Sequence, residues 1–95
     1  MPTDLIRLIN SIGKSTFVRY YDEFANSSLS SQDVVALLPE EYTLKSRNSR
    51  TAHARRIFRE GLEEEALEVI VHAQGVDMET ANGAQELLRR VRRSK

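Results

Sequence analysis

Apolar residues in the first quarter of the chain recur at the spacing of one helical face, i, i+3, i+4 and i+7. One stripe comprises Leu5, Leu8, Ile9 and Ile12. A second stripe comprises Phe17, Tyr20, Tyr21 and Phe24. On one continuous helix, turning about 100° per residue, the two stripes would face different directions. Residues 1–25 therefore predict a pair of helices. Thr3 or Asp4 caps the first, Gly13 ends it, and the second spans about residues 16–25.

The middle of the chain, residues 30–60, predicts a short helix, a connector and a longer basic helix. Ser30 and Asp33 resemble a capping box before a helix over 31–38, which Pro39 ends. Pro39 to Ser46 forms the connector, and Asn48 or Ser49 caps a helix over 49–60. The expected inward side of that helix carries Ala54, Ile57 and Phe58. The expected outward side carries Ala52, Arg55, Arg56 and Arg59.

The last third of the chain predicts a second pair of helices, over residues 62–93. After the stop signal of Gly61, one stripe comprises Leu62, Ala66, Val69, Ile70 and Ala73. Leu67 and Val71 are apolar on the far side, so this helix is expected to be buried on two sides or to face a second subunit. Gly75 ends it, and Asn82 with Gln85 predicts the cap of a last helix. That helix carries Ala84, Leu87, Leu88 and Val91.

These elements predict an all-α fold, a compact bundle of about five or six short helices in one domain spanning residues 1–95. With 40% hydrophobic and 29% charged residues, the composition is that of a soluble globular domain. No apolar run approaches the roughly 18 residues that cross a bilayer, and no secretory signal opens the chain. We therefore expect no membrane partner and a cytoplasmic location.

The net charge of zero is an average over blocks of opposite sign. Residues 1–44 hold three basic and six acidic residues, whereas residues 45–59 hold six basic residues and no acid. Residues 60–86 hold eight acids and no Lys or Arg, and residues 87–95 hold five basic residues and no acid. A local basic surface attracts phosphates even when the whole chain is neutral.

The residues Gly13, Lys14, Ser15 and Thr16 match the end of a phosphate-binding P-loop, but the context excludes that reading. A P-loop needs an earlier glycine and a preceding buried strand, whereas residues 4–12 have helical spacing and position 8 is leucine. A turn between two helices, with Lys14 in solvent, explains these residues better.

No metal, cofactor or catalytic site is predicted. The chain has no cysteine, and neither His53 nor His72 has a ligand partner at helical spacing. The carboxylates of Glu63, Glu64 and Glu65 point to different sides of a helix, so no acid–base pair converges. We therefore do not expect an enzyme.

The basic segment from Lys45 to Arg59 carries the functional hypothesis. Its start is small and polar, and its arginines suit phosphates or guanine edges, which is the chemistry of a helix in the major groove of DNA. The predicted nucleic-acid-binding residues are Lys45, Arg47, Asn48, Ser49, Arg50, Thr51, Arg55, Arg56 and Arg59. We expect the C-terminal arginines to add nonspecific affinity.

Residues 30–60 also resemble a helix-turn-helix in the order of their elements, with 31–38 as the supporting helix and 49–60 as the reading helix. The resemblance covers about 30 residues and implies a small DNA-binding protein, such as a transcriptional or phage-type regulator. The connector is longer than the usual turn of three or four residues, so the crossing angle of the two helices is open.

Two alternatives compete with DNA binding. The arginine-rich face can be a solvated surface that pairs with neighbouring acids. The chain can instead be a protein-interaction or dimerisation module, in which the acidic segment 60–68 and the two-sided helix over 62–73 bind a partner or form a homodimer.

Overall fold

The computed structural model describes residues 4–94, and every regular element among them is a helix. The helices are α1 (Leu5–Ile12), α2 (Lys14–Arg19), α3 (Tyr21–Ala25), α4 (Ser31–Leu37), α5 (Leu44–Arg59), α6 (Glu63–His72) and α7 (Met78–Arg93). The predicted all-α fold is confirmed, with seven helices in this part of the chain instead of five or six. Within it, no helix has the length and apolarity needed to span a membrane. Thr3 and Lys95 lie outside the described residues.

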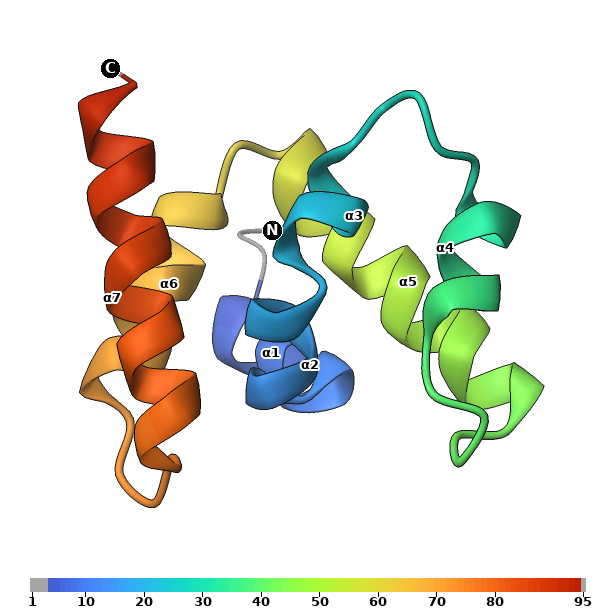
Figure 1. Cartoon of the computed structure of the whole chain (residues 1–95), viewed down its shortest axis with the longest axis horizontal. Coiled ribbons are helices and arrows are strands. Elements are labelled where there is room, and N and C mark those ends of the chain that lie inside the picture. The colour runs from blue at the N-terminus through green and yellow to red at the C-terminus, as the bar shows by residue number, and fades with distance from the viewer. Residues whose placement is uncertain (1–3, 95) are drawn as a thin grey trace.

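The helices are arranged with α6 and α7 at one end of the molecule and α4 and α5 at the other (Figure 1). The first three helices lie between these two pairs. α1 packs along α5, and α2 packs against α7. One apolar core contains buried side chains from all seven of the described helices or their caps.

An aromatic cluster forms the centre of this core. Phe17 is fully buried and lies 5.6 Å from Tyr21, 6.4 Å from Phe24 and 5.8 Å from Phe58, measured between ring centroids. The angles between the rings include both stacked and edge-on pairs, the arrangements that aromatic quadrupoles favour. Burial raises the pKa of Tyr21 to about 12, so its phenol stays neutral in the core.

Side-chain caps begin four of the helices. The expected capping box of Ser30 and Asp33 is present at α4, with reciprocal hydrogen bonds of 3.0 and 3.1 Å. Asp4 caps α1 by accepting from a backbone amide, as predicted. The backbone amide of Ser30 holds the pKa of Asp33 below its usual value, and the Thr80 hydroxyl does the same for the pKa of Asp77. These carboxylates are therefore ionised as they cap their helices.

Two predicted helix starts are wrong by about one turn. The basic helix does not begin at Asn48 or Ser49, because Thr43 caps it and the helix runs from Leu44. The last helix does not begin at Asn82, because Asp77 accepts hydrogen bonds from the amide and hydroxyl of Thr80. The missed turns contain polar or small residues, so no apolar stripe marked them.

Gly83 of α7 serves a packing purpose. A Cβ atom on Gly83 would lie 2.8 Å from Cγ1 of Val18, closer than real Cβ contacts allow. The absence of a side chain at position 83 therefore lets α2 and α7 approach closely.

The predicted second helix, over residues 16–25, is divided in the structure into α2 and α3. The backbone leaves helical geometry at Tyr20, with φ −110° and ψ 23°. Phe17 and Phe24, from the two pieces, still share the core. The aromatic spacing thus predicted the inward side correctly and the continuity of the helix incorrectly.

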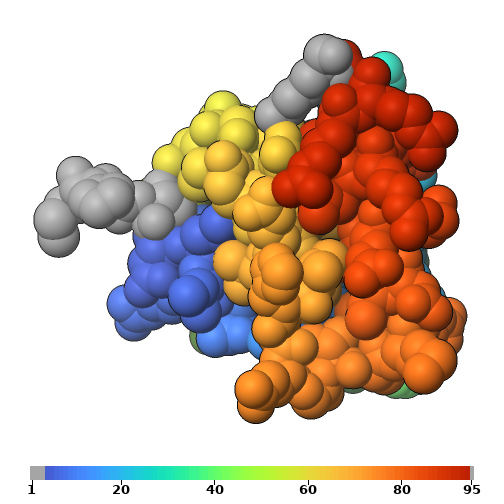
Figure 2. Space-filling view, turned by 90° about the vertical axis from the view of Figure 1, so that its left-hand side faces the viewer, coloured from blue at the N-terminus to red at the C-terminus, as the bar shows by residue number. Residues whose placement is uncertain are grey.

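Helix α6 is buried on two sides, one of the two outcomes expected from its sequence. Ala66, Leu67 and Ile70 have no exposed surface. Figure 2 shows α6 as a strip between α1 and α7, in agreement with its contacts to both helices. Its largest apolar side chains are therefore covered within the chain.

The burial of α6 predicts the effect of shortening Ile70, which has no exposed surface. Ile70→Ala should lower the free energy of unfolding by about 2–5 kcal/mol, because it leaves a cavity in a close-packed core. The same substitution at Ile6, which is 59% exposed, is the matched control and should change stability by less than about 0.5 kcal/mol. Urea denaturation followed by circular dichroism measures both. Equal losses for the two variants would contradict the core assignment.

Candidate nucleic-acid interface

One side of α5 is exposed along its whole length and faces away from the core. At helical spacing, the exposed side chains on this outward face are Lys45, Asn48, Ser49, Ala52, Arg56 and Arg59. Five of these six belong to the predicted nucleic-acid-binding set, and Ala52 was expected to face outward. Because α5 begins at Leu44, the residues from Lys45 to Asn48 belong to the same rigid helix as the later arginines. The face is therefore longer than the sequence indicated.

The outward face is slim at its middle and charged at both ends. Ala52 lies near its centre, with Lys45 toward the start of the helix and Arg59 at its end. No ion pair joins Lys45 or Arg59 to another residue within 4–94. Arg56 differs, because its Nε lies 2.6 Å from Oε2 of Glu60 in an exposed i, i+4 pair. Such surface pairs contribute little to stability and exchange readily with other ions.

The side chain of Arg50, in contrast, points toward α1 and the connector and is bonded there. Its guanidinium donates to the backbone carbonyl of Ile12 at the end of α1 and, through Nε, to the Ser46 hydroxyl at 2.9 Å. The same guanidinium lies 3.9 Å from the centre of the Tyr42 ring. The Tyr42 hydroxyl is in turn 3.0 Å from that of Thr16. Arg50 thus fixes α5 against the corner between α1 and α2.

Gly13 makes room for this contact. Its φ of +91° favours glycine, and a Cβ atom built on it would lie 2.9 Å from Nη1 of Arg50. Neighbouring Lys14 donates to the side chain of Asn10 at 3.1 Å on the surface. The expected turn between two helices, in place of a P-loop, is confirmed by this geometry.

The remaining members of the predicted set do not lie on the outward face. Thr51 is 1% exposed and belongs to the core side of α5. The outward placement expected for Arg55 is wrong, because its Nη2 donates to the carbonyls of Leu29 at 2.7 Å and Asn26 at 3.3 Å. Arg47 is half-buried, and its Nε has no hydrogen-bond partner among the described residues. The basic segment therefore contains two kinds of cation: Lys45, Arg56 and Arg59 face outward, whereas Arg47, Arg50 and Arg55 face other parts of the fold.

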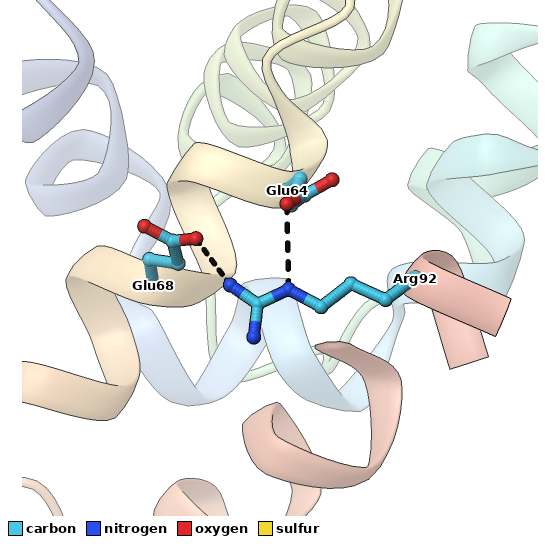
Figure 3. A network of polar contacts seen from close by, with 3 residues as sticks. All are labelled: Glu64, Glu68 and Arg92. Atoms are coloured by element: carbon cyan, nitrogen blue, oxygen red, sulfur yellow. Dashed lines mark hydrogen bonds and ion pairs between the residues drawn. The ribbon is translucent and has the colours of Figure 1, made fainter. Parts of the chain in front are cut away.

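The C-terminal arginines are largely paired with acids. Arg92 of α7 lies between Glu64 and Glu68 of α6, with 3.4 Å between its Nε and Glu64 (Figure 3). Arg90 pairs with Asp22, and Arg89 pairs with the neighbouring Glu86 at 2.9 Å. Arg90 and Arg92 therefore join α7 to α3 and α6, whereas Arg93 has no ion pair among the described residues.

Two grooves border the outward face. One lies between α1 and α5, and the other lies between α4 and α5. Neither groove could be predicted from the spacing of residues within one helix, because each is lined by residues from two helices. No group of three or more His, Asp or Glu side chains within residues 4–94 is placed to hold a metal ion.

Comparison with known proteins adds no relative: no protein-family model, curated protein or solved structure matches the chain. The function is therefore inferred from the geometry of α5 and its surroundings.

The inward contacts of Arg50 predict a cost for replacing it with lysine. Arg50→Lys keeps the charge and removes the planar fork that reaches Ile12 and stacks on Tyr42. We expect the free energy of unfolding to fall by about 1.5–3 kcal/mol, the range for hydrogen bonds to charged groups. Arg59→Lys, on the outward face, is the matched control and should leave urea denaturation unchanged. Indistinguishable transitions for the two variants would show that Arg50 does not fix α5.

Proposed function

We propose that the protein binds duplex DNA through the outward face of α5, as a small regulator that catalyses no reaction. The observation that carries the proposal is the composition of this face. It combines the cations of Lys45, Arg56 and Arg59 with Asn48 and Ser49, and it has a small residue, Ala52, near its middle. A helix with a narrow polar surface fits the major groove, where cations hold phosphates and amide or hydroxyl groups reach base edges.

The neighbouring elements support this use of α5. The inward arginines fix the orientation of the helix, since Arg50 holds it to the end of α1 and Arg55 holds it to the loop before α4. α4 packs against α5, in the order of the helix-turn-helix resemblance. The connector, residues 38–43, is shorter than expected but still exceeds a turn of three or four residues. A rigid reading helix keeps its side chains in register with the groove.

A fluorescence-anisotropy titration of random duplex at several salt concentrations tests the proposal. Affinity should fall linearly with log salt, with several ions released on binding. Arg59→Ala should lower the number of released ions by about one. Arg19→Ala, the same change at an exposed position of α2, is the matched control and should leave the dependence of affinity on log salt unchanged. No binding at low salt, or equal slopes for both variants, would contradict the proposal.

A specific feature favours self-association as a second candidate function. Leu44 is 61% exposed at the α4–α5 edge of the molecule, where it lines a groove of about 380 Å³ with Val35, Ala36 and Arg47. Exposed acids lie at position 33 on α4 and at positions 40 and 41 in the connector. A second copy of the chain offers complementary charges and apolar surface, so it is the occupant that this edge suits. This differs from the expected homodimer through residues 62–73, whose largest apolar side chains are covered within the chain.

Sedimentation velocity over a range of protein concentrations tests self-association. The second candidate predicts a dimer for the native chain and a monomer for Leu44→Gln, because the substitution removes exposed apolar surface from the groove without adding charge. Ile6→Gln, at a similarly exposed position on α1, is the control and should still dimerise. A native chain that stays monomeric at every concentration would exclude this candidate without affecting the DNA proposal.

A further inference from the structure

The groove between α1 and α5 adds a cationic surface beside the outward face. Its volume is about 280 Å³, and its walls are Asp4, Arg7, Leu8, Ser11, His53 and Arg56. The α1 residues recur at intervals of three and four, so they form one side of that helix. Arg56 belongs both to this groove and to the outward face. A ligand lying along the face would therefore reach the groove.

The relative direction of the two helices places the groove beside the middle of α5. Ile12, at the end of α1, contacts Arg50 through its carbonyl, whereas the start of α1 shares the groove with His53 and Arg56. α1 therefore runs antiparallel to α5, and Arg7 lies across the groove from the later turns of α5. No hydrogen bond or ion pair occupies the Arg7 guanidinium among the described residues.

The tautomer of His53 follows from its contact with the backbone. Its Nδ1 lies 2.7 Å from the carbonyl oxygen of Ser49, and because a carbonyl can only accept, Nδ1 carries the hydrogen. The Ser49 hydroxyl lies 3.3 Å from the same nitrogen. Nε2 has no hydrogen-bond partner within residues 4–94. When protonated, this nitrogen becomes a second N–H donor beside the groove.

The acids near the groove are already engaged. The side chain of Asp4 accepts from the backbone amide of Arg7 at 3.1 Å as the cap of α1. Glu60 pairs with Arg56 from outside the groove lining, at 2.6 Å on the exposed surface. A phosphate that approached Arg56 would compete with Glu60 for the guanidinium, and arginine binds phosphate oxygens with charge-assisted hydrogen bonds.

We propose that this groove seats one backbone phosphate of bound duplex DNA, held by Arg7, His53 and Arg56, with Ser11 as a further donor. The inference rests on the proposed function and deepens it, since it adds α1 to the DNA contact. The charged or titratable groups that line the groove with His53 are Asp4 and Arg7 from α1 and Arg56 from α5.

The test uses the full chain in the same anisotropy titration. At low salt, Arg7→Ala should weaken duplex binding about tenfold and lower the number of released ions by about one, as expected for one lost phosphate contact. Arg19→Ala should match the native chain. His53→Gln should also weaken duplex binding at low salt, whereas His72→Gln, at an exposed position at the end of α6, should match the native chain.

Two further measurements separate the outcomes. Circular dichroism melts of Arg7→Ala and His53→Gln should match the native melt, so that lost binding is not lost folding. Inorganic phosphate at the same ionic strength should displace the duplex no better than chloride, since the groove is proposed to hold a phosphodiester and not free phosphate. Specific displacement by phosphate would overturn the assignment to the DNA backbone. Duplex binding that neither Arg7→Ala nor His53→Gln alters would overturn the groove and leave the α5 proposal standing. No duplex binding at all would overturn both.

Discussion

One half-buried guanidinium helps to fix the position of α5. Arg50 reaches the last carbonyl of α1, which has no partner within its own helix, and covers the ring of Tyr42 from the connector. Through Tyr42 the contact extends to Thr16 of α2. A single side chain thus joins three segments of the chain that apolar packing alone would leave free to slide. The outward face of α5 has a defined direction because its opposite side is held in this way.

The apolar pattern was sufficient to predict the fold class and the core. Helices appear wherever the spacing predicted them, and the inward residues Ala54, Ile57 and Ile70 are fully buried. The pattern failed where helices are not amphipathic. The first turns of α5 and α7 contain polar or small residues, and they were recognisable only by their caps, Thr43 and Asp77. Local capping chemistry is therefore the better signal for where such helices begin.

The candidate site was predicted only in part, because the role of an arginine depends on tertiary structure. The sequence showed a block of cations without acids, but it could not show which carbonyls would need donors. Arg50 and Arg55 are drawn inward by backbone carbonyls of distant segments, whereas Arg59 is not. The acids that neutralise Arg92 and Arg90 lie 24 or more residues away along the chain. Counting charge by block thus overstated the cationic surface at the C-terminus and described that of α5 more closely.

The close approach of α2 and α7 depends on the absence of a Cβ atom at Gly83. At Gly83 the two helices are so close that even a methyl group would meet Val18. The separation of these helices is consequently encoded by the smallest residue, not by interlocking side chains. A larger residue at position 83 would therefore require Val18 or one of the two helices to shift.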